Sequence, residues 1–297
     1  MKVAVKVPGT CGELVQGLID GHNFLVSFPI NKYSQVVVLP HCQSDIVVAP
    51  KWRTKVKEAA IKTLTYFNQN MGLVITVESD LPIGKGWASS SADVLATICA
   101  VAKITGNSIT ERDIAQIALS IEPTDSVFLP GLAMFDHVTG ERFETLGPAL
   151  PMNVLALEFS DTVDTLMFNC RPELQQLNRA KEKEIRASLE LVKAGVREQN
   201  VKKVAQGATI SSLAHQRVLY KPHLEAVLDL AMAHQAIGIN IAHSGTTIGI
   251  LFEGEVLPSE TLLTKLKQQI PGIQEIHLLE AICGGISYEI ASAWGKY

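Results

Sequence analysis

Hydrophobic residues follow two kinds of spacing along the chain, and the first kind predicts strands. Alternating or short continuous runs of valine, isoleucine, leucine and phenylalanine are typical of β-strands. In the first half of the chain, such runs cover residues 2–7, 24–39, 45–49 and 73–77. We expect the first strand to end at Pro8 and Gly9, because this pair favours a turn.

The second kind of spacing, with apolar residues three and four positions apart, predicts helices between these strands. One helix is expected over residues 54–69. Another begins after a loop rich in glycine and serine at residues 82–91, and Gly106 is suited to end it in the left-handed conformation. Thr110 and Asp113 resemble a capping box at the start of a further helix.

The second half of the chain mixes strands and helices in a different order. The predicted strands cover residues 154–159, 237–241, 247–252 and the segment from residue 272 onward. The predicted helices cover residues 173–194, a continuation to about 215, residues 222–236 and residues 261–269. This order is typical of an α+β layer with helices on one face of a sheet. A stretch with two prolines at residues 147–151 marks the expected boundary between two domains, residues 1–150 and 151–297.

The composition indicates a globular protein and argues against several classes. Its 26 basic and 30 acidic residues give a net charge of −4 without a basic cluster, so no nucleic-acid partner is expected. No apolar run approaches the roughly 20 residues that a membrane helix needs, so no membrane partner is expected either. Five widely spaced cysteines and an N-terminus unlike a signal peptide predict a cytoplasmic location.

The sharpest chemical signal is the loop before the second helix, where small residues let a ligand approach the backbone. Free N–H groups and the helix dipole make such an N-terminus a binding site for phosphate. The loop is not a Walker A motif, because Gly86 follows Lys85 where that motif has serine or threonine. A capped helix after a flexible turn is the alternative. The candidate phosphate-binding residues are Pro82, Gly84, Lys85, Gly86, Ala88, Ser89, Ser90 and Ser91.

Two carboxylates three positions apart, Glu122 and Asp125, follow the third predicted helix. Such a pair can divide two tasks: one acid holds a metal ion, and the other accepts or orients the proton of a hydroxyl group. An acidic turn exposed to solvent is the alternative interpretation of these residues.

Two further segments are candidates for the walls of a pocket. Residues 8–17 place two glycines around Glu13 directly after a strand, which is typical of an ordinary turn or of a loop that lines a substrate site. Residues 242–249 lie between two apolar strands and contain His243. A tight hairpin with a structural histidine is the alternative for this second segment.

The order of these four segments resembles that of the GHMP kinase superfamily, which includes galactokinase, homoserine kinase, mevalonate kinase and phosphomevalonate kinase. The family has an N-terminal Pro-Gly motif ending in Gly-Glu, a Pro-x-x-x-Gly-x-x-Ser-Ser phosphate loop and a C-terminal Ser-Gly motif. Here these motifs are residues 8–13, 82–91 and 244–249. Within the superfamily, the runs Pro-Gly-Thr-Cys-Gly-Glu-Leu-Val-Gln-Gly and Glu-Pro-Thr-Asp resemble the L-threonine kinases of cobalamin synthesis.

The resemblance implies a two-domain GHMP kinase fold of the α+β class. Its N-terminal α/β domain would be ribosomal-S5-domain-2-like, and its C-terminal domain ferredoxin-like. The implied reaction is ATP-dependent phosphorylation of the hydroxyl of L-threonine to O-phospho-L-threonine, for the aminopropanol arm of cobalamin synthesis. A kinase of another small alcohol, such as homoserine or a mevalonate-pathway intermediate, is the alternative, as is a family member that binds without catalysis. The expected partner is a small amino acid with a hydroxyl group, and the sequence leaves a homodimer open.

The resemblance also implies the location of ATP and Mg²⁺. By position in the motifs, Ser90 and Glu122 match the residues of a Mg²⁺ site, and the triphosphate of ATP lies on the loop of residues 84–91. Lys85 is expected over the phosphates or, alternatively, at the plain surface. Trp87 and Ala88 replace the usual Leu-Gly pair of the family, which narrows the loop.

The implied substrate site lies between the two domains. Asp125 is the candidate for accepting the hydroxyl proton, or alternatively for binding the ammonium group of the substrate. The lysine that mevalonate kinases carry in the first motif is replaced near Thr10, so that group is missing here. The other residues expected to bind the amino acid are Thr10, Cys11, Gly12 and Glu13 in the first motif and His243, Ser244 and Gly245 on the floor of the pocket.

Overall fold

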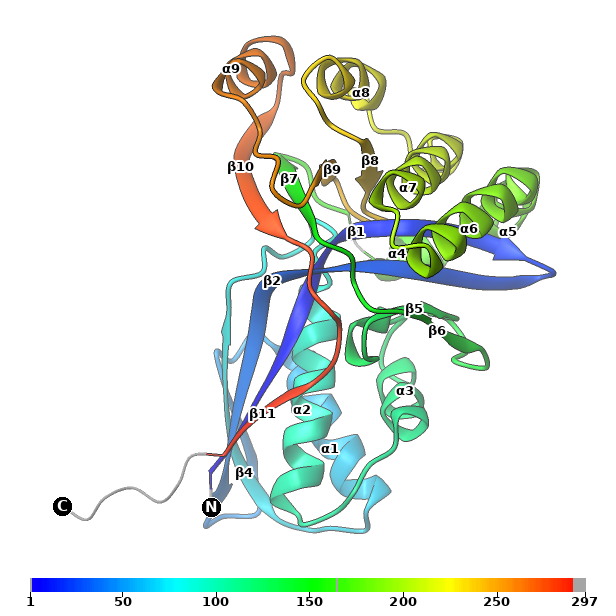
Figure 1. Cartoon of the computed structure of the whole chain (residues 1–297). Helices are drawn as coiled ribbons and strands as arrows, with labels where there is room; N and C mark the ends of the chain where they lie inside the picture. The colour runs from blue at the N-terminus through cyan, green and yellow to red at the C-terminus, as the bar shows by residue number, and fades with distance from the viewer. Residues whose placement is uncertain (1, 164, 291–297) are drawn as a thin grey trace.

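A long ribbon of two antiparallel strands, β1 (Val3–Ile19) and β2 (His22–His41), forms the centre of the molecule. The computed structural model of the chain describes residues 2–163 and 165–290. The ribbon turns at Asp20 and Gly21, whose φ angles of 53° and 82° suit a tight hairpin. Both strands extend through the two halves of the molecule (Figure 1), and they therefore join these halves in one sheet with the order β10-β7-β9-β8-β1-β2-β4-β3.

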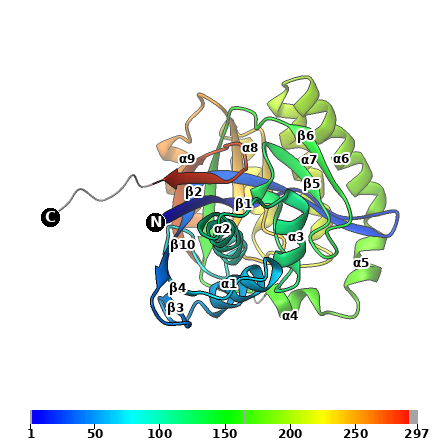
Figure 2. The ribbon, with the colours of Figure 1, turned by 90° about the horizontal axis from the view of Figure 1, so that it is seen from below.

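The first half of the chain packs helices against one part of this sheet. Strands β4 (Gly72–Ser79) and β3 (Ile46–Ala49) extend the sheet beyond β2. Helices α1 (Thr54–Tyr66), α2 (Ser89–Ile104) and α3 (Glu111–Leu119) lie together beside it (Figures 1 and 2). Because α2 is apolar or small on nearly every side, it forms the centre of the core. Among the described residues, no helix has the length and apolar character needed to cross a membrane.

The second half adds four antiparallel strands and a row of helices. The strands are β7 (Met152–Phe159), β8 (Gly238–Ile241), β9 (Ile248–Glu253) and β10 (Ile273–Glu280). The helices are α5 (Leu174–Ala180), α6 (Glu182–Arg197), α7 (Val201–His215), α8 (Leu224–Met232) and α9 (Glu260–Gln269). These helices lie along the upper side of the molecule in Figure 1. The arrangement confirms the predicted α+β class.

Several short elements have no counterpart in the sequence prediction. They are η1 (Ser126–Phe128), β5 (Leu132–Phe135), β6 (Phe143–Gly147) and α4 (Thr165–Asn169). By contrast, β11 (Ser287–Ile290) falls in the segment from residue 272 onward, where strands are expected. Strand β11 pairs with β1, so the chain returns to the first half near its end. The division at residue 150 stays a prediction, and strands of both halves pair across it.

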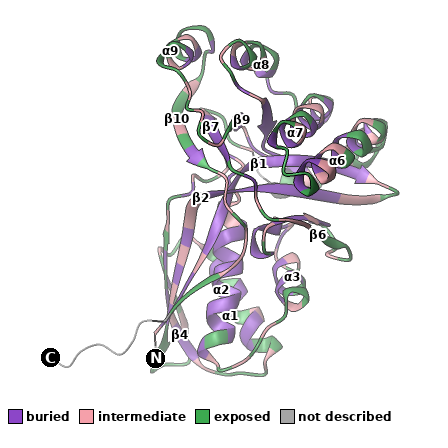
Figure 3. Cartoon of the chain, viewed as in Figure 1, coloured by how far each residue is buried: buried purple, intermediate pink, exposed green. Residues whose placement is uncertain are grey.

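Two hydrophobic clusters follow from this arrangement. The larger cluster contains Leu95 and Ile98 of α2 together with Leu189 and Val192 of α6, so it continues from one half of the chain into the other. The smaller cluster lies between β7–β10 and helices α8 and α9. Figure 3 shows the buried residues concentrated along α2 and the central ribbon, while the outer faces of the helices are exposed.

Strand β1 continues past Pro8 and Gly9, so the prediction that this pair ends the strand is wrong. Its register with β2 shifts between Pro8 and Thr10 and twice more before Val15. These shifts are bulges, and a proline is tolerated at a bulge because its missing N–H is not needed there. The N–H of Thr10 donates instead to the carbonyl O of Trp87 at 3.1 Å. The bulged segment thus turns from β2 towards the glycine-rich loop.

The single helix predicted over residues 173–194 is also wrong, because α5 and α6 meet at Lys181. The side chain of Lys181 is fully buried. Its Nζ donates to the backbone O of Gln16 at 2.9 Å and lies 2.9 Å from Nδ1 of His215. Burial lowers the pKa of Lys181 to about 7. Helical spacing does not reveal such a break, because its partners come from distant parts of the chain.

Local signals at the ends of helices are confirmed. Gly106, with a φ of 76°, follows the end of α2, as a left-handed C-terminal glycine does. The N–H of Asp113 donates to Oγ1 of Thr110 at 3.2 Å, and the N–H of Thr110 donates to Oδ2 of Asp113 at 3.3 Å. This reciprocal pair is the predicted capping box.

We predict that Lys181→Met reduces the increase in stability between pH 7 and pH 9. The pKa of Lys181 is about 7 in the folded chain, against 10.5 for an ordinary lysine. The unfolded chain therefore binds more protons in this range, and the free energy of unfolding rises with pH by up to about 1.4 kcal/mol per pH unit for this one group. Urea unfolding of both proteins at pH 7 and pH 9 measures the difference in slope.

The neighbouring Lys183 is exposed, and Lys183→Met serves as the matched control. This variant should keep the slope of the unsubstituted protein. Equal slopes for all three proteins would show that Lys181 keeps its proton in the folded chain up to pH 9, which would contradict the lowered pKa.

Candidate active site

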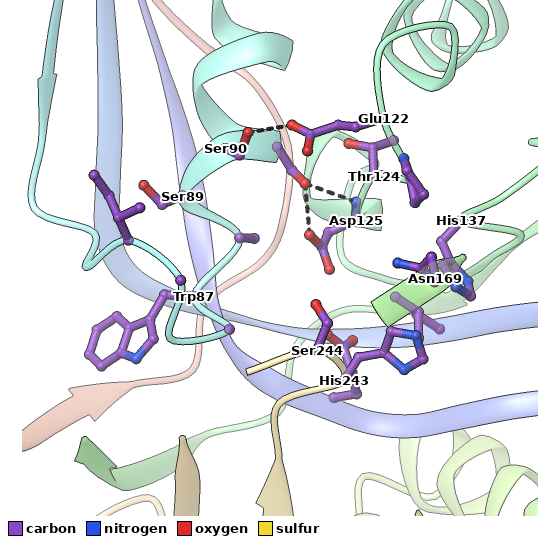
Figure 4. Close-up of a pocket in the computed structure, with 18 of the residues that line it drawn as sticks. Trp87, Ser89, Ser90, Glu122, Thr124, Asp125, His137, Asn169, His243 and Ser244 are labelled. Atoms are coloured by element: carbon purple, nitrogen blue, oxygen red, sulfur yellow. Dashed lines mark hydrogen bonds between the residues drawn. The ribbon is translucent and has the colours of Figure 1, made fainter. Parts of the chain in front are cut away.

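The loop of residues 82–88 ends at the first turn of α2, as the sequence predicts. Ala88 is the N-cap residue, with a left-handed φ of 56° and no side-chain cap. The first N–H groups of α2 are thus left for a ligand, because an N-terminus without a cap leaves up to four donors unused. Figure 4 shows this turn at one wall of a pocket that Glu122, Asp125, His137 and His243 also line.

Contacts with the turn of residues 242–247 hold the loop in place. Trp87 Nε1 donates to Oγ1 of Thr247 at 2.9 Å, and that hydroxyl donates to the carbonyl O of Lys85 at 2.8 Å. Gly86 faces the same turn so closely that an added Cβ would lie 2.1 Å from the Cβ of Ala242. An added Cβ at Gly245 would lie 2.2 Å from the carbonyl O of Lys85. Glycine is therefore required on both sides of this contact.

The side chain of Lys85 lies neither at the phosphate-binding pocket nor at the surface, which were the two positions expected for it. It is buried, and its Nζ donates to the carbonyl O atoms of Ser160 at 3.1 Å and Asp161 at 2.9 Å, just beyond β7. It also lies 4.0 Å from Oε1 of Glu158. Lys85 thus fixes the loop to the end of β7 and does not line the pocket.

Ser90 and Glu122 come together at the start of α2. The hydroxyl of Ser90 donates to Oε1 of Glu122, and Lys55 Nζ lies 2.6 Å from Oε2 of the same carboxylate. Glu122 is 3% exposed, so its carboxyl oxygens depend on these two partners for hydrogen bonds. A hydroxyl and a carboxylate oxygen in contact are the kind of donors that Mg²⁺ prefers.

Asp125 and Glu13 form an acidic pair beside the helix end. The hydroxyl of Ser91 donates to Oδ2 of Asp125 at 2.8 Å. Burial raises the pKa of Asp125 to about 6. Burial and the neighbouring Asp125 hold the pKa of Glu13 well above its ordinary value. Such a pair favours a cationic ligand, because a positive charge between the two carboxyls stabilises their charged forms.

The floor of the pocket contains two residues that the sequence did not indicate, His137 and Asn169. Burial lowers the pKa of His137 to about 4, so its imidazole is neutral. His137 follows β5, and Asn169 ends α4, and neither element was predicted. The sequence signal that could have located His137 is the aspartate before it, because aspartate favours turns. In the structure, the side chain of Asp136 accepts a hydrogen bond from the N–H of Thr139 at 2.9 Å in such a turn.

The structure brings many of the predicted site residues to this one pocket. Those that line it are Glu13, Pro82, Gly84, Gly86, Ala88, Ser89, Ser90, Ser91, Glu122, Asp125, His243 and Ser244. Those predicted residues that do not line it are Thr10, Cys11, Gly12, Lys85 and Gly245.

The residues outside the pocket support its wall. Cys11 is fully buried, and its carbonyl O accepts a hydrogen bond from Nδ2 of Asn240. Gly12 has a φ of 62°, and its Cα faces the backbone of Ile241. These contacts attach the bulged part of β1 to β8, which places the carboxyl of Glu13 at the pocket.

Comparisons with known proteins decide the family. Residues 54–129 match the family model described as the N-terminal domain of GHMP kinases. An L-threonine kinase from Salmonella typhimurium is 33% identical to this chain over 95% of its length, which covers 94% of that relative. An L-threonine kinase from Citrobacter freundii is 31% identical over 95% of this chain and 98% of that relative. The chain belongs to the GHMP kinase family.

The fold is shared more widely within the GHMP kinases. The crystal structure of homoserine kinase from Cytophaga hutchinsonii matches with a TM-score of 0.72 and 16% sequence identity over 97% of both chains. At this identity the likeness shows the fold alone, and it confirms the predicted GHMP kinase fold. The segment that matches the family model contains the phosphate loop, Glu122 and Asp125.

We predict that Gly86→Ala disrupts the active site of this GHMP kinase. The new methyl group would collide with Ala242, so the loop and the turn of residues 242–247 must separate. We expect kcat/KM for kinase activity to fall at least about 10-fold, because a misplacement of about 1 Å costs up to about 100-fold in rate.

Gly21→Ala provides the matched control for backbone strain. The φ of Gly21 is 82°, close to the 88° of Gly86, but nothing lies within 4 Å of a Cβ added at Gly21. This variant should lose about 1–2 kcal/mol of stability from the left-handed backbone while keeping its activity. Equal activity losses in the two variants would contradict the proposed role of the close contact at Gly86.

Proposed function

We propose that the protein transfers the γ-phosphoryl group of ATP to the hydroxyl of L-threonine, producing O-phospho-L-threonine and ADP. The observation that carries this proposal is one pocket in which an uncapped helix N-terminus faces an acidic pair, Glu13 and Asp125. The first feature suits phosphate, and the second suits the ammonium group of an amino acid. The two L-threonine kinases that match nearly the whole chain support this choice of amino acid.

The nucleotide would occupy the loop and an adjoining hollow. The triphosphate lies on the N–H groups at the start of α2, where the helix dipole favours negative charge. The second hollow shares Ile83, Ser89 and Ser90 with the first and continues to Trp52 and Arg53. Trp52 is 59% exposed there, which gives the nucleoside of ATP an aromatic surface to contact.

Ser90 and Glu122 would hold the Mg²⁺ ion. Their oxygens are already in contact, and Mg²⁺ needs only one or two protein oxygens besides phosphate and water. When bound, the ion neutralises charge on the phosphates during transfer. Lys55 stabilises the charge of Glu122 from the side opposite Ser90.

Asp125 would receive the proton of the substrate hydroxyl. The hydroxyl oxygen forms a bond to the γ-phosphorus, while the bond from this phosphorus to the bridging oxygen breaks and ADP leaves. The proton passes to Oδ1 or Oδ2 of Asp125, which the hydroxyl of Ser91 holds in place. Since the transition state of phosphoryl transfer is loose, the placement of these groups supplies most of the rate.

The substrate is tested by ADP release in the presence of Mg²⁺, with L-threonine, L-serine, L-homoserine or mevalonate supplied separately. We expect the highest kcat/KM for L-threonine and the lowest for mevalonate, which has no ammonium group to pair with the acids. Faster turnover of homoserine or mevalonate than of L-threonine would replace the proposed substrate. Turnover of none of them would favour the binding protein without catalysis.

The role of Asp125 as the proton acceptor is tested by substitution and by the pH dependence of the reaction. Asp125→Asn should lower kcat by about 100-fold or more, because general-base groups contribute about 10²–10⁴-fold. In the unsubstituted protein, kcat/KM should rise as pH increases through about 6, since burial raises the pKa of Asp125 to that value and only the carboxylate accepts a proton. This inflection should be absent from the pH profile of the variant.

Asp229→Asn, on the exposed face of α8, is the matched control. It should keep both kcat and the inflection near pH 6. Retention of the inflection in Asp125→Asn would assign it to another group, such as Glu13.

A further inference from the structure

Several buried polar atoms at the floor of the pocket have no hydrogen-bond partner within the described part of the chain. Leaving a buried polar group unpaired is costly, so such atoms point to a ligand. Burial is nearly complete for their residues, which are 2%, 4%, 7% and 2% exposed for Glu13, His137, His243 and Thr124. The atoms are Glu13 Oε2, Thr124 Oγ1, His137 Nδ1 and His243 Nε2, and all four residues line the same pocket.

The contacts of Gln16 determine which nitrogen of His243 carries the proton. The amide Nε2 of Gln16 donates to the carbonyl O of Ile241 at 3.2 Å. The amide Oε1 of Gln16 therefore faces His243 Nδ1, at 2.9 Å. An amide oxygen only accepts, so Nδ1 must be the protonated nitrogen. In the neutral ring, Nε2 is then left with a lone pair.

Burial, together with neighbouring basic groups, keeps the ring of His243 neutral. Burial lowers its pKa well below the ordinary value, and His137, Lys181 and Lys221 lower it further. His215 is also close, with its ring centre 5.4 Å from that of His243. A second proton on this ring would therefore be opposed by its burial and by groups that follow β5, separate α5 from α6, end α7 and precede α8.

A hydrogen bond from His215 holds the backbone of His243, and its direction follows from the partner atoms in the same way. Nε2 of His215 lies 3.1 Å from the carbonyl O of His243, so it is the donor. Nδ1 of His215 is then free to accept from Lys181 Nζ at 2.9 Å. Both the position and the protonation of His243 are thus set by residues of β1, α7 and the break between α5 and α6.

We propose that Gln16 holds His243 in the tautomer with the proton on Nδ1, so that Nε2 accepts a hydrogen bond from the α-ammonium group of the amino-acid substrate. This assignment rests on the proposed function. Gln16 is a positioning residue, because it lies behind the ring and acts through His243. The unpaired Oε2 of Glu13 provides a second acceptor for the same ammonium group.

An ammonium group fits these atoms better than the carboxylate of the substrate does. A carboxylate has no hydrogen to donate to the lone pair of His243, and Asp125, with a pKa of about 6, would repel it at pH 7. An ammonium group has three N–H donors, and the pocket offers a lone pair on His243 and carboxyl oxygens on both acids. The polar floor would therefore bind hydroxy acids that lack nitrogen more weakly than it binds an amino acid.

Nitrogen NMR of protein labelled with ¹⁵N in its histidine rings tests the tautomer without any assumption about activity. The chain has eight histidines, and comparison with His243→Asn assigns the signals of His243. We expect a protonated Nδ1 and an unprotonated Nε2 at pH 7, with a shift of the Nε2 signal when L-threonine is added. In Gln16→Met, which cannot accept from Nδ1, the proton should move at least partly to Nε2. A protonated Nε2 in the unsubstituted protein would overturn the proposal.

Steady-state kinetics test the bond to the ammonium group. Asparagine at position 243 keeps an amide donor for Gln16 but has no atom in place of Nε2. His243→Asn should raise KM for L-threonine about 10- to 100-fold, the range for a lost hydrogen bond to a charged group. The KM for ATP and the KM for (R)-3-hydroxybutanoate, which is L-threonine without its ammonium group, should not change. Gln16→Met should show the same selective increase, and His234→Asn, beyond the end of α8, should show none.

The failure of this inference differs from the failure of the proposed function. An unchanged KM for L-threonine in His243→Asn, with normal turnover, overturns the role of His243 alone. Equal increases in KM for L-threonine and (R)-3-hydroxybutanoate also overturn it, because the loss would not depend on the ammonium group. If no amino acid is phosphorylated by the unsubstituted protein, the proposed function fails and the ammonium assignment fails with it.

Discussion

The close contact between Gly86 and the turn of residues 242–247 is the constraint on which the active site depends. It brings together two backbone segments that are about 160 positions apart. The segments are so close that neither Gly86 nor Gly245 could carry a side chain. Hydrogen bonds of Trp87 and Lys85 with Thr247 and Asp161 then attach the loop to the second half of the chain. The N-terminus of α2 is aimed at the acidic pair as a result, because its loop has no freedom to turn elsewhere.

The sequence predicts those parts of the fold that depend on neighbouring residues. The end of α2 at Gly106 and the capping box of Thr110 follow from local backbone preferences, and both are confirmed. The break at Lys181 and the continuation of β1 past Pro8 depend on contacts with distant strands and helices, which spacing along the chain does not contain. Short elements such as β5 and α4 are too brief to give a periodic signal.

The same distinction applies to the candidate site. Residues in contiguous motifs, such as Ser90 and Glu13, were found because glycines, serines and acids stand together there in the sequence. Gln16 lies inside the first motif, but the sequence analysis did not single it out, and His137 lies in no motif. Only the folded arrangement brings the two beside His243. For Lys85 the motif suggested a role that the structure does not show. Although this lysine lies within the phosphate motif, its Nζ donates a hydrogen bond to a backbone carbonyl just beyond β7.

The central ribbon of β1 and β2 has a mechanical consequence. Strand β1 pairs with β2 and β11 in one half and with β8 in the other, and the larger hydrophobic cluster also continues between the halves. A rigid-body hinge between them would have to break backbone ladders and expose this cluster to water, at a cost far above thermal energy. We therefore expect the two halves to keep their relative position, so that the access of ligands to the pocket depends on the surrounding loops.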